Sequence, residues 1–226
     1  MFDYEAAIDL TVPIGAGMVL YPGDAPPRLR RLSSIEDGDP LTASELILGC
    51  HVGTHVDAPA HFLRDGLTVD RLAPAHFFGP AVVLDLTSRA RIELADVEKL
   101  PVPARHHVLL KTDNSALLRA GTFRPAYSYT TPAAMRRLLD SAPLSVGIDY
   151  YSFDPPAEAG YPAHRLIAAQ GLPAYVCLDL GNVAAGHYFF TAFALPVTGA
   201  EGLPVRAVLW PRGASGRANA RAVPPP

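Results

Sequence analysis

The chain has 226 residues, of which 49% are hydrophobic and 18% are charged, and its formal net charge is −3. A composition of this kind is typical of one globular domain with a sizeable core, and it excludes extensive disorder. The charges are spread along the sequence without a basic stripe, so nucleic acid is not an expected partner.

The N-terminal segment MFDYEAAIDL has neither the cationic nor the apolar region of a secretory signal. Prolines and glycines then interrupt residues 11–40, which we interpret as loops and turns with short extended pieces. No stretch of the sequence approaches 18 uninterrupted apolar residues, so a membrane is not an expected partner. The two cysteines, Cys50 and Cys177, lie far apart in the sequence and indicate a reducing compartment, so we expect a cytoplasmic protein.

The rest of the chain alternates between strand-like and helix-like segments. Apolar, β-branched runs predict strands at residues 81–86, 107–112, 144–148, 188–195 and 205–210. Helices are predicted at 92–100, at 132–140 after the N-cap pair Thr131-Pro132, and at 163–170 before Gly171, which suits a left-handed C-cap. This alternation predicts a mixed α/β (α+β) domain.

The segment HVGTHVDAPAH, residues 51–61, holds three of the eight histidines of the chain. Its ligand-type residues are His51, His55, Asp57 and His61. Every spacing among them is even, so an extended chain directs all four side chains to one face, whereas a helix would spread them. Because a straight strand would separate the outer pair by roughly 33 Å, we expect the chain to curl at Gly53 and Pro59 and to gather the side chains around one ion.

Imidazole and carboxylate donors without a thiolate favour Zn²⁺, Mn²⁺ or Fe²⁺ over Ca²⁺ or Mg²⁺. We expect Zn²⁺, with Mn²⁺ as the alternative. The competing interpretation is a histidine-rich loop whose side chains cap backbone groups or face solvent. Three histidines and an aspartate in phase, among small and apolar residues, favour the metal site.

The pattern H-x-G-T-H-x-D-x-P-x-H at residues 51–61 resembles the signature of the cyclase family of metal-dependent hydrolases, which includes bacterial kynurenine formamidase and isatin hydrolase. Weaker matches extend the likeness over nearly the whole chain: Tyr21-Pro22-Gly23-Asp24, the segment 78–85, Gly147-Ile148-Asp149 with Ser152, His164, and the segment 195–207. The expected fold is a swivelling β/β/α-type single domain with a central mixed sheet or barrel-like core. We assign this domain to residues 1–211 and treat 212–226 as a low-complexity tail.

The resemblance also implies roles for individual residues. His51, His55 and Asp57 would hold a first ion, and His164 would serve a second ion that Asp57 bridges. His61 would transfer protons rather than bind metal, and Tyr21 would form an aromatic wall for the substrate. The implied reaction is hydrolysis of a small amide or cyclic amide, in which His61 takes a proton from water and returns it to the leaving atom.

Other polar residues are expected to be structural. Asp24 and Asp149 belong to this group, whereas four histidines without a motif around them are expected to be surface or packing residues: His76, His106, His107 and His187. Cys50 follows a glycine and precedes His51, and in an extended chain its side chain points away from that histidine, so we expect it to be buried.

One position departs from the family pattern. A glutamate that bridges the two ions normally stands twelve residues after the last histidine, and this chain has Val176 there. Valine cannot bind metal, so we expect one ion, with a second ion weak or absent. Cys177 and Asp179 are near in sequence, but in a strand both are out of phase with position 176.

The valine leaves two alternatives to hydrolysis open. One is a biosynthetic cyclase or dehydratase that uses the ion as a Lewis acid, and the other is a non-catalytic protein that has kept the fold. The expected partner is a small-molecule substrate, and the resemblance implies a homodimer or homotetramer.

Overall fold

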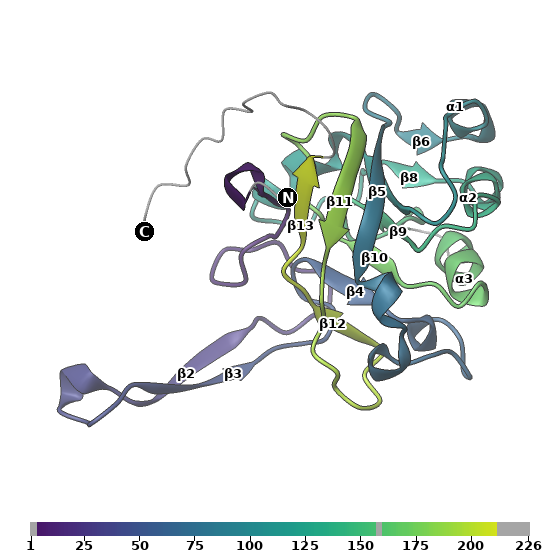
Figure 1. Cartoon of the computed structure of the whole chain (residues 1–226). Helices are drawn as coiled ribbons and strands as arrows, with labels where there is room; N and C mark the ends of the chain where they lie inside the picture. Colours follow the sequence, from purple (N-terminus) through teal and green to yellow (C-terminus); the bar gives the residue numbers. More distant parts are fainter. Residues whose placement is uncertain (1–3, 157–159, 212–226) are drawn as a thin grey trace.

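The computed structural model describes residues 4–156 and 160–211, so the predicted tail at 212–226 lies outside the described residues. Within this part of the chain, a nine-stranded sheet has the order β1-β13-β11-β5-β7-β9-β10-β4-β12 (Figure 1). Its strands are β1 (Ile8–Asp9), β4 (His55–Asp57), β5 (Phe78–Asp85), β7 (His107–Lys111), β9 (Ser145–Ile148), β10 (Ala174–Val176), β11 (Gly186–Thr191), β12 (Gly202–Pro204) and β13 (Val208–Pro211). The central strands β5, β7, β9 and β10 are parallel and their outer neighbours are antiparallel, so the predicted mixed sheet is confirmed.

The helices lie together on one side of this sheet (Figure 1). They are α1 (Leu94–Val97), α2 (Pro132–Leu139) and α3 (Pro162–Ala169). Two short sheets complete the regular structure: β2 (Arg28–Ser33) with β3 (Ala43–Ile47), and β6 (Arg91–Ile92) with β8 (Tyr129–Thr130). None of the helices in residues 4–156 and 160–211 is long and apolar enough to span a membrane.

The parallel strands are apolar on both faces because each face supports a separate core. On β5, Val82 and Leu84 pack in one cluster with helical residues such as Met135. The alternate residues Ala81 and Val83 belong to the second cluster on the opposite face. The two-residue period of a strand therefore divides one continuous apolar run between two layers.

The second core shows that the sheet is curled. Leu10 next to β1 and Leu209 of β13 lie at one edge of the sheet, and Val56 of β4 and Leu203 of β12 lie at the other, yet all four pack in or against the same cluster. Residues from opposite edges share a core only if the sheet bends round on itself. The predicted barrel-like core is therefore confirmed.

The local signals at the helix ends are confirmed. Thr131 caps α2, and its Oγ1 accepts a hydrogen bond from the backbone N–H of Ala134 at 3.3 Å. Gly171 follows α3 with a φ of +71°. The helix predicted at 92–100 is wrong in extent, because Glu93 and Asp96 form a capping box that starts α1 only at residue 94.

Two predicted strands are also shorter than expected. The strand predicted at 188–195 ends at Thr191, where its partner β5 begins at Phe78. The strand predicted at 205–210 begins only at Val208, the last residue in register with β1. Pairing with a neighbour, rather than the length of the apolar run, sets these ends.

The largest departure from the predicted elements is the hairpin β2–β3, which projects from the body of the molecule (Figure 1). The sequence prediction gave residues 11–40 as loops and turns with short extended pieces and gave no strand at 43–47, whereas β2 pairs with β3 in antiparallel register from Arg28–Ile47 to Ser33–Ala43. Its exposed aliphatic residues are Leu29, Leu32, Ile35, Leu41, Leu46 and Ile47. A two-stranded hairpin that buries little apolar surface gains little stability from the body beside it.

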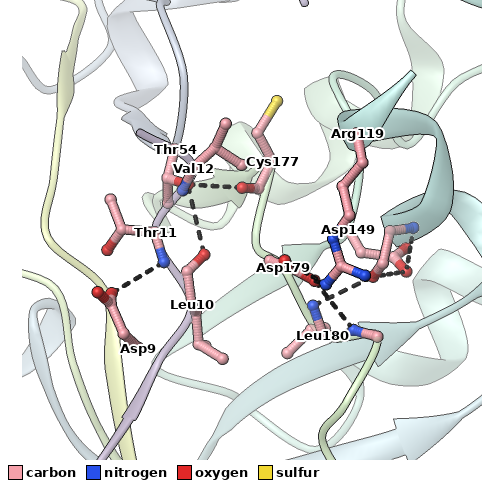
Figure 2. Close-up of polar contacts among 12 residues, drawn as sticks. Asp9, Leu10, Thr11, Val12, Thr54, Arg119, Asp149, Cys177, Asp179 and Leu180 are labelled. Atoms are coloured by element: carbon pink, nitrogen blue, oxygen red, sulfur yellow. Dashed lines mark hydrogen bonds and ion pairs between the residues drawn. The ribbon is translucent and has the colours of Figure 1, made fainter. Parts of the chain in front are cut away.

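Asp149, the residue that follows β9, holds the end of this strand in place through hydrogen bonds (Figure 2). Its carboxylate accepts bonds from the backbone N–H and hydroxyl of Thr112, at 3.0 and 2.6 Å, and from the same groups of Ser115, at 3.1 and 2.8 Å. Burial raises the pKa of this carboxyl, and the four donors act against that shift. The residue is structural, as expected, and it anchors the segment that carries Tyr151 and Ser152.

His107 is buried at the start of β7, where its Nδ1 lies 2.7 Å from Ser145 Oγ. Burial lowers its pKa to about 4, below the value of about 6.5 for an exposed histidine. Between these pH values the unfolded chain binds a proton that the folded chain excludes. We therefore expect the free energy of unfolding to fall as the pH falls through this window, by about 1.4 kcal/mol per pH unit from this group.

Urea unfolding of the wild type and of His107→Phe at several pH values between 7 and 4 measures this contribution. The slope of stability against pH should be shallower in the variant, whatever the absolute stabilities are. His107→Gln serves as a second variant if phenylalanine packs poorly. Equal slopes in the wild type and both variants would contradict the assignment.

Candidate metal centre

The motif at residues 51–61 curls where the sequence predicts. Gly53 has a φ of +64°, a conformation that residues with a Cβ rarely adopt, and it turns the chain just before β4. Pro59 opens the 3-10 helix Pro59–His61 immediately after β4. Between these turns, Thr54 Oγ1 donates to Cys177 O at 2.6 Å and accepts from Val12 N–H at 2.8 Å (Figure 2). Thr54 thus ties the start of β4 to two distant segments.

Three imidazoles converge on the carboxylate of Asp57. His51 Nδ1 lies 2.7 Å and His55 Nε2 lies 3.3 Å from Asp57 Oδ1. His164, in the first turn of α3, places its Nε2 3.9 Å from Asp57 Oδ2. Three predicted histidines from two distant parts of the sequence therefore surround the carboxylate of Asp57.

The electrostatics of this group follow from the contacts. Burial alone would raise the pKa of Asp57, but the neighbouring His55 and the hydrogen bonds with His51 and His55 outweigh it and hold the pKa well below its ordinary value. Burial lowers the pKa of His51, but its contacts with Asp57 and Glu201 raise it further than burial lowers it. The carboxylate is therefore ionised, which is the form that binds a cation.

Hydrogen bonds orient two of the imidazoles from behind. His55 Nδ1 donates to Gly53 O at 2.7 Å, and His164 Nδ1 donates to Asp154 Oδ2 at 2.6 Å. Asp154 also accepts the backbone N–H groups of Ala163 and His164 at the start of α3. These bonds fix the orientation of the two rings and aim their Nε2 atoms at Asp57, which is how metal-binding histidines are commonly held.

His61 differs from the other three histidines. Its ring stacks on His51, with 3.9 Å between ring centroids, and meets Phe62 edge-on at 4.4 Å. The ligand atoms of His51, Asp57 and His61 lie within 4.8 Å of one another, so His61 reaches the same point. Burial lowers its pKa, and although Asp57 opposes this effect, the surrounding imidazoles reinforce it. His61 is therefore neutral and free to accept a proton at neutral pH.

A pocket of about 400 Å³ is lined by the histidine group, which comprises His51, His55, Asp57, His61 and His164. Its walls are mainly aromatic, from Tyr21, Phe62, Tyr151 and Tyr161, and the other side chains that line it beyond the histidine group are Asp24, Ser152 and Arg165. A pocket of this size suits a small molecule with one or two rings.

The two sequence-predicted residues upstream of the motif both reach this pocket. Tyr21 lies in the wall, with its ring centroid 5.2 Å from that of Phe123. Asp24, expected to be structural, also lines the pocket, and burial raises its pKa while His51 and His55 act against that shift. The Tyr-Pro-Gly-Asp turn therefore contributes two side chains to the site rather than one.

Val176 occupies the side of the site where the family pattern has a carboxylate. It pairs directly with His55 between β10 and β4, so the two side chains share one face of the sheet. The valine is fully buried in the cluster beneath the helices. Asp179 forms an ion pair with Arg119 at 2.6 Å instead of facing Asp57 (Figure 2).

The two cysteines are unpaired. Cys177 does not follow strand alternation, because β10 ends at Val176 and Cys177 has a φ of +55°. Its thiol is fully buried, which raises its pKa well above the ordinary value and keeps it protonated. Cys50 is only partly buried, contrary to the expectation of a buried side chain.

The donor set fits a divalent transition metal. In a tetrahedral site with bonds of about 2.0–2.2 Å, neighbouring donor atoms lie about 3.3–3.6 Å apart. The distances from Asp57 to His51, His55 and His164, 2.7, 3.3 and 3.9 Å, bracket this range. Imidazole nitrogens with a carboxylate are ligands that Zn²⁺ and Mn²⁺ accept.

Gly202 lies under the ring of His51. A Cβ atom at this glycine would lie 2.4 Å from Cε1 and 2.9 Å from Nδ1 of His51, so Gly202→Ala must displace the ring. We expect this substitution to weaken the binding of a divalent ion by about tenfold or more, measured by competition with a chromogenic chelator. Gly49→Ala is the matched control, because a Cβ there meets no atom within 4 Å. Equal affinities in the two variants would contradict the assignment of His51 as a ligand.

A curled mixed sheet that carries a histidine–aspartate cluster beside an aromatic pocket is the arrangement expected of a metal-dependent enzyme of the mixed α/β class. Comparison with known families identifies it further, because the family described as "Putative cyclase" matches residues 8–155, more than half of the chain. The protein belongs to the cyclase family.

Similar proteins cover almost the whole chain. The kynurenine formamidase of Paracidovorax citrulli is 32% identical over 209 residues, which are 89% of this chain and 94% of that protein. The structure of a "predicted metal-dependent hydrolase" from Bacillus stearothermophilus superposes with a TM-score of 0.79 at 30% identity, covering 91% of this chain and 98% of the other. Isatin hydrolase A from Ralstonia solanacearum gives a TM-score of 0.78 at 25% identity, covering 90% and 91% of the two chains.

Proposed function

We propose that the protein is a metal-dependent hydrolase that cleaves the C–N bond of a small aryl amide or cyclic amide. The observation that carries this proposal is the convergence of His51, His55 and His164 on Asp57 in the lining of a pocket with aromatic walls. The names of the similar proteins, kynurenine formamidase and isatin hydrolase, describe hydrolases of this kind.

The proposed centre holds one ion, Zn²⁺ with Mn²⁺ as the alternative, on His51, His55 and Asp57, with His164 completing the set. When bound, a divalent ion supplies Lewis acidity that polarises a carbonyl and acidifies water. The apolar side chain of Val176, opposite His55, supports one ion rather than two because it supplies no second carboxylate.

The side chains then carry the remaining steps. Neutral His61 accepts the proton that water loses as it attacks the carbonyl carbon, and it returns that proton to the leaving nitrogen when the C–N bond breaks. The lowered pKa of His61 supports this role, because the neutral form is the proton acceptor. Tyr21 and the other aromatic walls bind the ring of the substrate and exclude water from it.

Metal analysis and a substrate panel test the proposal together. The purified protein should contain about one ion per chain and should hydrolyse N-formyl arylamines or isatin. A chelator should abolish this activity, and added Zn²⁺ or Mn²⁺ should restore it. A protein that binds an ion but cleaves no amide in the panel would contradict the proposed reaction and favour a cyclase. A protein without metal after growth in supplemented medium would contradict the metal centre.

We further propose that the chain assembles as a homodimer or homotetramer in the cytoplasm. The aliphatic side chains on β2–β3 support assembly, since a large exposed apolar surface commonly marks an interface. The hairpin also leaves and rejoins the body between Asp24 and His51, both of which line the pocket. Light scattering at several concentrations measures the assembly state. The free thiols of Cys50 and Cys177 support a reducing compartment.

A further inference from the structure

A carboxylate outside the motif contacts the proposed centre. Glu201 precedes β12, and its Oε1 lies 3.3 Å from Nε2 of His51. Strand β12 fixes the backbone of this segment against the motif, because Gly202 pairs with Asp57 and the N–H of Ala58 donates to Glu201 O at 2.8 Å. The contact between Glu201 and His51 is therefore made from a backbone segment that the pairing of β4 with β12 holds in place.

The three imidazoles that face Asp57 share one arrangement. In each, one nitrogen is directed at Asp57 and the other contacts an oxygen acceptor. The acceptors are Gly53 O for His55, Asp154 Oδ2 for His164 and Glu201 Oε1 for His51. An acceptor of this kind fixes the ring orientation and the tautomer of a metal-binding histidine.

His51 depends on its acceptor more than the other two histidines do. The side chains of His55 and His164 are 3% and 2% exposed and lie on a strand and a helix, whereas that of His51 is 23% exposed and lies in the turn before β4. Packing therefore restrains the first two rings from every side. Besides the 2.7 Å contact of its Nδ1 with Asp57, the ring of His51 is restrained by stacking on His61, by close packing against Gly202 and by the contact with Glu201.

We propose that Glu201 is the positioning residue of His51: it accepts the Nε2–H of this imidazole and thereby holds Nδ1 toward Asp57 for the ion. This inference rests on the metal centre of the proposed function but not on the reaction. Glu201 acts through His51 and does not itself bind the ion. Loss of its carboxylate frees the ring to rotate and to change tautomer, and such substitutions weaken metal binding by about tenfold to a hundredfold.

A double-substitution cycle tests this proposal with Co²⁺ as the probe, measuring its affinity by titration and its ligand field by visible absorption. Glu201→Ala should lower the affinity for Co²⁺ by about tenfold to a hundredfold and alter the absorption bands. Glu201→Gln keeps an oxygen acceptor and should restore most of the affinity. In a His51→Ala background, Glu201→Ala should cause no further loss, because the two side chains act as one unit.

Glu98→Ala is the matched control, since Glu98 is exposed at the end of α1 and its contact with Arg137 uses only its backbone carbonyl. Thermal unfolding of the metal-free variants shows whether the fold is kept. The proposal is overturned by a Glu201→Ala variant with wild-type affinity, or by an equal loss of affinity with and without His51. A wild type that binds Co²⁺ as described but hydrolyses no amide would overturn only the proposed reaction.

Discussion

Asp57→Asn is expected to abolish metal binding and to lower kcat/KM for amide hydrolysis by about a thousandfold or more. The carboxylate is the one group that all three imidazoles face, and its oxygens lie within 2.7–3.9 Å of their nitrogens. Asparagine keeps the shape but removes the charge that attracts the cation. The expected loss corresponds to about 4 kcal/mol of transition-state stabilisation, within the several kcal/mol that a bound metal ion supplies.

Elemental analysis and steady-state kinetics on the same preparations measure this effect. Asp65→Asn is the control for a general loss of charge, because Asp65 is exposed and lies four residues beyond the motif. Thermal unfolding of the metal-free proteins separates loss of the ion from loss of the fold. An Asp57→Asn variant that still bound one ion per chain with wild-type affinity would rule out Asp57 as the centre of the site.

His61→Gln is expected to retain the ion and to lower kcat by about a hundredfold to ten-thousandfold, the usual range for loss of a general acid–base group. The reason is that the His61 ring stacks on His51 and is held by ring contacts, whereas the other three imidazoles each have an oxygen acceptor behind the nitrogen that faces away from Asp57. KM should change little, because the aromatic walls that bind the substrate remain.

The metal content of this variant decides between two roles. Since the ligand atoms of His51, Asp57 and His61 lie within 4.8 Å of one another, the geometry also admits His61 as a ligand. Loss of the ion together with the activity in His61→Gln would establish that role and refute proton transfer. His187→Gln, which alters an exposed histidine on β11, should leave both metal content and kcat unchanged.

Local features of the structure could be predicted from the sequence because short-range interactions set them. The even spacing of His51, His55 and Asp57 fixes a common face, and Gly53 and Pro59 supply the turns that curl the chain. The N-cap of α2 at Thr131 and the left-handed turn at Gly171 after α3 likewise depend on residues next to the helix ends. These features need no knowledge of distant segments.

The short strands could not be predicted, because their neighbours define them. Strands β4, β10 and β12 have three residues each, too few for a clear period, and they exist through their pairing with one another. The pairing of β2 with β3 was not predicted, because the prolines and glycines around the hairpin indicate loops with only short extended pieces. Which residues of two strands pair depends on both segments, so the side-chain periodicity of one segment alone does not predict the register.

The sequence by itself determined the ligand-type residues of the motif, their common face and the turns around them. Only the tertiary structure decided which residues from distant parts of the sequence contact these side chains. Asp154 lies ten residues before His164, and Glu201 lies 150 residues after His51, yet both contact the histidines directly. The physical reason is that a residue pattern specifies the direction of a side chain relative to its own backbone, whereas the packing of the whole curled sheet specifies which distant groups it meets.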